Sequence, residues 1–519
     1  MNLMLALILA ASAGTVPSVP ARDFRSDPPA VASLEVVALP GASANQSVLK
    51  VRFAEADLPT SIPIAYKGAV LHDDGTGEDA ARDGVYSAIV ESTPAERLAL
   101  TPGPVSAAAT LDPGKTLLIR DTSVVNNSRT SDPCLSNNPE DAKKKWTFGY
   151  LMTQIANQAQ TGKTPSQLAL SLLRQWERND KVVNGELIPG RPAMKTLVTD
   201  KWLRASGNNG TLAMHKAPFR LLAIVNRVDL RQNLFFGEGL AGELRFVWGV
   251  LDLENRAPDG TCQEDGSFAV IMEYAVDKAN PAEVKAWGQK WVDLNSKTLN
   301  SAAYREALQA LTESVVKAGA GQPFGRANGS ALIRIRTNEI ALDSPWELRE
   351  FAVAQAPSSA AGLFVPVTTK QTPAVAHNGT ALFAQFVNDN EARILAGRHN
   401  VPIEFTDVPF RGGHSLNNID FWTGPQIRNK TARHIVSLNT CNGCHGAETN
   451  TSFLHVFPRP RATRASLSGF LTGVDVIDPE DGRTSRHFAD LPRRAADLQQ
   501  LTTAPTLSQL GFQPLSRTH

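Results

Sequence analysis

Short runs of alternating apolar and polar residues mark the first hundred positions of the chain. These runs fall at 34–37, 47–53 and 85–90 and are separated by clusters of Gly, Pro and Asp. Alternation with a period of two is typical of half-buried strands, and short strands between turn residues favour a β-sandwich. We therefore expect a small β-sandwich domain over residues 22–105.

Helical spacing of apolar residues starts further along the chain. Thr164-Pro165-Ser166-Gln167 combines the residues of a capping box with Pro at the first helical position. Asn-Pro pairs at 138–139 and 280–281 are similar helix starts. Helices are therefore expected from Asn138 through Trp146 and Ile155 towards Gly162, from Thr164, from Asn280 through Trp291, and over Tyr304–Val315.

Apolar runs typical of strands lie between and after these helices. They cover 221–225, 243–253, 268–275 and 333–336. Helices and strands in runs, without regular βαβ repetition, predict an α+β domain over residues 130–400. Residues 106–130 have no clear pattern and are expected to be a connector. The whole chain is thus predicted to be a multidomain α+β protein.

Composition narrows the class of protein. The 519 residues include 42% hydrophobic and 20% charged residues, with 52 Lys plus Arg against 51 Asp plus Glu. These values exclude a wholly disordered chain. The near-zero net charge gives no general electrostatic reason to bind nucleic acid. After residue 13, no apolar stretch reaches the roughly 20 residues that a membrane span needs.

The N-terminus predicts export. Met1–Ala13 is an apolar run followed by small residues up to Ala21, which is typical of a secretory signal peptide over residues 1–21. The run contains no Lys or Arg, so the alternative is the hydrophobic N-terminus of a cytosolic protein. Export predicts a periplasmic or secreted protein, in which thiols pair or bind a ligand.

One acidic segment of the N-terminal region has a recognisable pattern. His72-Asp73-Asp74-Gly75 and Asp83-Gly84-Val85-Tyr86 frame it, and it resembles the DDG…DGVY segment of immunoglobulin-like modules in secreted bacterial proteins. The resemblance implies a packing or anchoring module without catalysis. Calcium binding by the clustered acids is an alternative, but their spacing does not follow the D-x-D-x-D-G loop, and Asp and Gly also favour tight turns.

The strongest chemical motif is Cys441-Asn442-Gly443-Cys444-His445 near the C-terminus. C-x-x-C-H is the attachment pattern of c-type haem. Two thiols three positions apart on one helical turn can add to the two vinyl groups of one porphyrin. The adjacent His can then present its imidazole to the iron.

At these residues the segment resembles the c-type cytochromes. The resemblance implies covalent haem c, with Cys441 and Cys444 as thioether residues and His445 as the proximal iron ligand, in a mainly helical, cytochrome c-like module over residues 401–519. No Met follows Met272, although small cytochromes carry a downstream Met ligand. His455 is the first candidate for a distal ligand, and the other possibilities are His487, His434, His414, a Met of the central domain or an open position.

The arginines after Cys441 are a weaker indication of haem binding. That segment holds eight Arg and no Lys, and Arg suits haem propionates. Seven acids share the segment, so internal ion pairs are the default interpretation.

Other uses of the Cys pair remain open. Cys441 and Cys444 could form a redox disulfide, or bind zinc with His445 and a second His. Three functions follow: an electron carrier that uses a redox partner protein or a small-molecule donor or acceptor, a peroxidase- or oxygenase-like haem enzyme, or an envelope structural or binding protein. No catalytic residue can be assigned in the central domain.

The remaining two cysteines lie in polar loops. Cys134 follows Ser131-Asp132-Pro133, and Cys262 follows Asp259-Gly260-Thr261. In an oxidising compartment we expect them to form a structural disulfide that closes a loop of more than a hundred residues.

Overall fold

The computed structural model divides the chain into two compact units. One contains residues 1–110, 390–399 and 500–516, and the other contains 111–389, 400–499 and 517–519. The described residues are 31–38, 46–53, 61–63, 70–74, 84–91, 111–179, 181–231, 241–278, 281–395, 399–417 and 421–503. The predicted signal peptide lies outside them.

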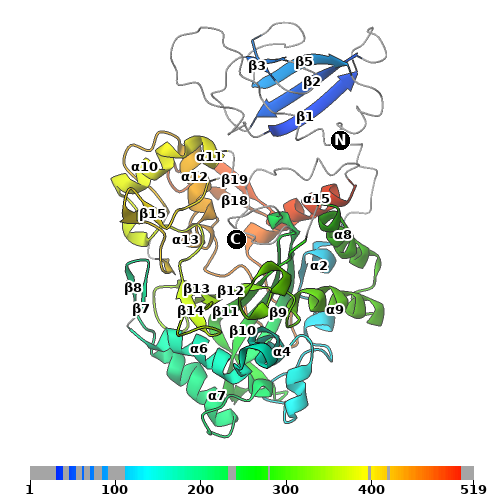
Figure 1. Ribbon diagram of the computed structural model, residues 1–519, viewed down its shortest axis with the longest axis vertical. Helices are drawn as coiled ribbons and strands as arrows, with labels where there is room; N and C mark the ends of the chain where they lie inside the picture. The colour runs from blue at the N-terminus through cyan, green and yellow to red at the C-terminus, as the bar shows by residue number, and fades with distance from the viewer. Residues whose placement is uncertain are drawn as a thin grey trace. The chain divides into compact units, whose positions relative to one another are not determined.

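The N-terminal unit contains a five-stranded antiparallel sheet in the order β1-β2-β5-β4-β3 (Figure 1). Its strands are β1 (Val31–Ala38), β2 (Gln46–Phe53), β3 (Ser61–Pro63), β4 (Val70–His72) and β5 (Val85–Glu91). The alternating pattern buries Leu49, Val51 and Leu71. The three predicted strands are confirmed, whereas the β-sandwich and its immunoglobulin-like identity stay predictions. Residues 75–83 of the acidic segment lie outside the described residues.

A large antiparallel sheet dominates the second unit and confirms the predicted α+β class (Figure 1). Its order is β14-β13-β12-β11-β10-β9-β6, with β17 paired to β13. Residues 111–130 of the segment expected to be a connector contain β6 and two short helices and belong to this unit. The strands are β6 (Leu118–Ile119), β9 (Phe219–Arg227), β10 (Glu243–Arg256), β11 (Cys262–Ala275), β12 (Leu332–Glu339), β13 (Glu347–Val353), β14 (Phe364–Val367) and β17 (Ser415–Leu416).

Most predicted helices are confirmed, with one correction. The capping box of Thr164 and Gln167 starts α6 as expected. A single helix from Asn138 towards Gly162 is wrong, because Thr147 caps a new helix and Asn157, at φ 45°, ends it. The helices are α2 (Pro113–Thr116), α3 (Thr122–Val125), α4 (Phe148–Ala156), α5 (Gln158–Thr161), α6 (Pro165–Glu177), α7 (Asp200–Ala205), α8 (Pro281–Val292) and α9 (Ala302–Val316), besides short 3₁₀ turns such as Pro139–Lys143.

The two faces of the large sheet differ in chemistry. On one face Phe246, Met272 and Ile335 are register neighbours, and all three are buried. Aromatic side chains of the helices pack on this face: Phe148 of α4 stacks on Phe219 with 3.9 Å between ring centroids. The opposite face carries charged residues at alternate positions of β10 to β13. This charged face is the one that meets the cysteine motif.

The C-terminal part of the second unit combines short helices with two-stranded hairpins. Residues 400–499 belong to the same compact unit as 111–389, and the separate cytochrome c-like module over 401–519 stays a prediction. The elements of this part are α10 (Ala381–Asp389), β15 (Glu404–Phe405), β16 (Val408–Pro409), α12 (Lys430–Asn439), α13 (Cys441–Cys444), α14 (Gly469–Thr472), β18 (Val474–Ile477), β19 (Ser485–Phe488) and α15 (Asp490–Thr503). The short helix α11 (Glu391–Leu395) and the last residues of α15 are grouped with the first unit.

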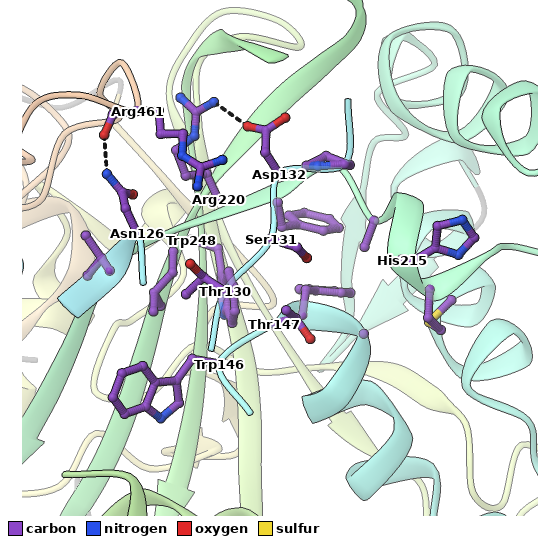
Figure 2. A pocket seen from close by; sticks show the side chains of 18 residues that line it. Asn126, Thr130, Ser131, Asp132, Trp146, Thr147, His215, Arg220, Trp248 and Arg461 are labelled. Atoms are coloured by element: carbon purple, nitrogen blue, oxygen red, sulfur yellow. Dashed lines mark hydrogen bonds and ion pairs between the residues drawn. The ribbon is translucent and has the colours of Figure 1, made fainter. Parts of the chain in front are cut away.

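The expected disulfide between Cys134 and Cys262 is confirmed. Asp132 holds both halves of the bridge, since its Oδ1 accepts the backbone N–H of Cys134 at 3.0 Å and of Cys262 at 3.1 Å. Arg220 in turn reaches Asp132 Oδ2 at 2.9 Å, at the edge of a small cavity of about 20 Å³ (Figure 2). Among the described residues, no helix has the length and apolar character needed to cross a bilayer.

Candidate functional site

The C-x-x-C-H motif forms one helical turn, as its spacing predicts. Thr440 caps α13, and its Oγ1 accepts the backbone N–H of Gly443 at 3.0 Å. A Cβ at Gly443 would lie 2.0 Å from the carbonyl oxygen of Ser437, so only Gly fits against the end of α12. The N–H of Cys441 donates to Thr372 Oγ1 at 2.9 Å. The motif is therefore fixed both within its own segment and against the central part of the chain.

Both motif cysteines are free thiols in the interior. Cys441 and Cys444 are 0% exposed. Cys441 packs in a cluster with Trp346 and Leu348, which flank the start of β13. Burial raises the pKa of Cys441 to about 11. At neutral pH this side chain is therefore a protonated thiol and not a nucleophilic thiolate.

His445 is held in a single orientation. Its Nδ1 lies 2.6 Å from the backbone carbonyl oxygen of Phe453, and Trp346 stacks on its ring with 5.2 Å between centroids. Because a carbonyl oxygen only accepts, Nδ1 carries the proton and Nε2 carries the lone pair. Burial lowers the pKa of His445 to about 4. The imidazole is thus neutral at physiological pH, with Nε2 able to bind a metal ion.

His455 lies beside His445 and contacts the second thiol. The two ring centroids are 4.3 Å apart, and His455 Nε2 lies 3.2 Å from Cys444 Sγ. The other ring nitrogen lies 2.8 Å from Ser468 Oγ. Burial, and then the neighbouring His445 and Arg494, lower the pKa of His455 well below its usual value. The assignment of His455 as distal ligand stays a prediction, and in this structure its Nε2 faces sulfur.

A cavity of about 70 Å³ opens beside the two imidazoles. The C-terminal segment contributes both His side chains together with Leu454, Val456 and Leu471. The charged face of the sheet contributes apolar side chains such as Val247 and Ile271. Four arginines from different elements also reach the cavity: Arg227, Arg245, Arg336 and Arg494. This volume lies below the roughly 300–1,000 Å³ that is usual for small-molecule and cofactor sites, so a large ligand would have to widen the cavity.

Ion pairs on the sheet surround these arginines. Arg336 lies 3.0 Å from Glu350 and 3.4 Å from Glu273, and Glu273 also lies 3.2 Å from Arg245. Burial alone would raise the pKa of Glu350, but Arg334 and Arg336 lower it to about 2. These carboxylates are therefore ionised, and they hold the arginine side chains in position at the cavity.

The other histidine candidates are paired elsewhere. His414 contacts Glu347, His434 contacts Glu448, and the exposed His487 lies 2.8 Å from Asp475. Of the C-terminal arginines, Arg494 lines the cavity, whereas others pair with acids, as in Arg486 with Asp478.

The zinc alternative finds little geometric support. Within the described part of the chain, two groups bring three potential ligand atoms within 4.8 Å of one another. One group is Asp132 with the disulfide cysteines, and the other is His434 with Glu448 and Asp478. Neither contains a residue of the C-x-x-C-H motif.

Sequence reasoning located the motif but missed the residues around it. Arg227 and Arg245 lie about two hundred positions before the motif, and Arg336 lies about a hundred positions before it. All three are on strands of the central domain. The alternation of Ile333-Arg334-Ile335-Arg336 was the available signal, since it indicates a strand with one charged face. That pattern normally indicates a solvent-exposed face, and here the face is buried.

Comparisons with protein-family models, curated proteins and solved structures find no match for this chain.

Proposed function

We propose that this chain is an exported c-type haem protein whose function is electron transfer. Cys441 and Cys444 would carry the haem through thioether bonds, and His445 would be its proximal iron ligand. The observation that carries the proposal is the geometry of His445. Its Nδ1 is fixed by the Phe453 carbonyl, and the ring lines the cavity. Metal-binding histidines commonly donate their second ring N–H to such a carbonyl, which fixes the tautomer.

The donor side chains at this site are those that hold a haem group, and the cavity of about 70 Å³ would have to widen to admit the macrocycle. Two cysteines outside any disulfide are one helical turn apart beside a neutral imidazole. Apolar side chains such as Leu454, Val456 and Leu471 suit the macrocycle, and the arginines suit two propionates. When bound, haem supplies an iron that exchanges single electrons.

The surrounding residues would tune that iron. Arg336 and Arg494 line the cavity while paired with Glu350 and Asp490, so these ion pairs would set the electrostatic field at the iron and thereby its reduction potential. The burial of Cys441, Cys444 and His445 limits the access of water. Limited water access suits a carrier, whereas a peroxidase- or oxygenase-like function needs an open position at the iron.

Maturation of the full chain with the c-type haem apparatus tests this proposal. We expect a pyridine haemochrome spectrum of covalent haem, which should disappear in the Cys441→Ala/Cys444→Ala variant. His445→Gln should retain the thioether bonds but change the spin state, and the matched control His487→Gln should change neither. Low-spin bands would support the carrier and high-spin bands an enzyme. Haem staining that survives loss of both cysteines would refute the attachment site.

A second candidate function is thiol redox chemistry, which the 3.2 Å contact between Cys444 Sγ and His455 Nε2 favours. An imidazole at that distance can hydrogen-bond to the sulfur and orient it. In that case the matured chain would contain no haem, and Cys441 and Cys444 would interconvert between a dithiol and a disulfide by exchange with the disulfide or dithiol of a partner, which accepts or supplies the two electrons and two protons.

A further inference from the structure

A larger cavity lies at one end of β12, β13 and β14. Its volume is about 420 Å³, and its lining includes Leu332, Val353 and Val367 from these strands. Four cationic side chains also line it: Arg326, Arg334, Lys370 and Arg411. Among the described residues that line this cavity there is no Asp or Glu. The lining of this cavity thus combines apolar side chains with four cationic side chains.

Arg326 and Arg334 have carboxylate partners close by. Arg326 forms a two-point ion pair with Asp277 at 2.7 and 2.8 Å. Arg334 pairs with Glu350 and lies 4.0 Å from Glu273. The charges of these two guanidinium groups are therefore balanced within the fold.

Arg411 differs from these two. Its Nε donates to the backbone carbonyl of Val401 at 2.8 Å, and its Nη2 donates to the side-chain oxygen of Asn400 at 3.2 Å. No described carboxylate forms an ion pair with it. Burial lowers the pKa of Arg411, and the like charge of Arg334 lowers it further, while Glu350 partly compensates. A cation in this position gains from an external anion.

The position of Arg411 is fixed by a strained residue. Gln371 has a φ of 56°, in the left-handed region that non-glycine residues rarely adopt. Its Nε2 donates to Asn400 Oδ1 at 2.8 Å, and its Oε1 accepts the N–H of Val401 at 2.8 Å. Gln371 therefore fixes the positions of Asn400 and Val401, the two residues that accept hydrogen bonds from Arg411. Strain of this kind is concentrated at ligand clamps and active sites.

We propose that this cavity binds a small organic anion, whose carboxylate or phosphate group pairs with Arg411 and whose apolar part contacts Leu332, Val353 and Val367. The convergence of cations in a cavity without acidic lining supports the charge of the ligand. The volume is suited to a molecule of metabolite size. The two cavities share no lining residue, so titration of the haem-free chain tests this site separately from the proposed haem.

Isothermal titration of the full chain with inorganic phosphate, pyrophosphate, succinate, citrate and hexanoate tests the proposal. We expect saturable binding of at least one probe, weakened at least tenfold in Arg411→Gln. Arg411→Lys, which keeps the charge, should retain part of the affinity. Arg174→Gln, at an exposed position of α6, is the control for net charge. Phosphate-type probes and carboxylate-type probes form separate arms that identify the head group. Absence of saturable binding across the series, or equal affinity in Arg411→Gln, would overturn the proposal.

A second variant tests the proposal even if Arg411→Gln does not fold. Ala352 lines the same cavity and is partly exposed on β13. In Ala352→Asp the new carboxylate should occupy the cationic site, so thermal stability should stay at or above that of the parent chain and probe binding should be lost. A large fall in melting temperature, or unchanged probe binding, would contradict an anion site at this position.

Discussion

His445 Nδ1 lies 2.6 Å from the carbonyl oxygen of Phe453, and Phe453 itself has a φ of 65°. A phenylalanine in the left-handed region costs conformational energy, of order 1–3 kcal/mol. Phe453 also stacks on Trp346, which in turn stacks on His445. The strained backbone and the two ring contacts together fix which nitrogen of His445 is available to a ligand.

The first prediction concerns the acid stability of the haem-free chain. The folded pKa of His445 is about 4, below its ordinary value of 6.5, so the unfolded chain takes up a proton first on acidification. The associated stability is fully present above pH 6.5 and is lost as the pH falls towards 4, by about 3 kcal/mol. Urea unfolding at a series of pH values should show this loss in the parent chain and a smaller loss in His445→Gln.

The control for that experiment is His487, which is exposed. His487→Gln should leave the dependence of unfolding free energy on pH unchanged. A dependence that is the same in His445→Gln and in the parent chain would contradict the assignment of a buried, neutral imidazole to His445.

The second prediction concerns the reactivity of Cys441. Its pKa of about 11 against an ordinary value of 9 lowers its thiolate fraction at pH 8 about a hundredfold. Alkylation of the native, haem-free chain should therefore be at least tenfold slower at Cys441 than in urea, as measured by peptide mass spectrometry. Stability linked to this thiol should fall as the pH rises from 9 towards 11, because the unfolded thiol ionises first. Equal alkylation rates in the native and the denatured chain would count against its burial.

The third prediction concerns the disulfide. Cys134 and Cys262 are 128 positions apart, and closing so long a loop stabilises the folded chain by about 5 kcal/mol in the chain-entropy model. Cys134→Ser/Cys262→Ser should lower the unfolding free energy by several kcal/mol. Alkylation of the unreduced, haem-free chain under denaturing conditions should label two cysteines, Cys441 and Cys444. Four labelled cysteines would show that the bridge does not form.

The fourth prediction concerns the ion pairs beneath the cavity. Glu350 balances Arg334 and Arg336, and all three are buried. Glu350→Gln leaves two buried cations without this carboxylate and should lower stability by about 3–5 kcal/mol. Glu254→Gln, which breaks the exposed pair with Arg204, is the matched control and should cost less than about 1 kcal/mol. Similar losses in the two variants would show that the buried network adds nothing to stability.

Local patterns in the sequence were sufficient for much of the fold. The capping box of Thr164 and Gln167 predicted the start of α6, apolar runs predicted β10 and β11, and alternation predicted β12. The same local logic failed at Asn157, where a left-handed residue ends a helix that apolar spacing would have continued. Polar loops around Cys134 and Cys262 were enough to predict their pairing, because the chain was expected to be exported.

The sequence predicted the motif residues of the site but not the arginines around them, and the reason is physical. Cys441, Cys444 and His445 are neighbours in the chain, so their spacing shows their chemistry directly. Arg245 and Arg336 reach the same cavity through strand pairing and through packing of the C-terminal segment on the sheet. Such long-range contacts leave no local signal beyond the alternation of charged residues. The hydrogen bond between Gln371 and Val401 could not be predicted either, because nothing in the sequence indicates that a Gln residue will adopt a positive φ.

The intact mass of the full chain, produced with the c-type maturation apparatus and then denatured, tests the central claim most directly. Covalent attachment predicts a mass increase of one haem that survives acid–acetone extraction, with the modified peptide containing Cys441 and Cys444. A chain that gains no mass under conditions in which a control cytochrome is matured would contradict the assignment of this site to haem.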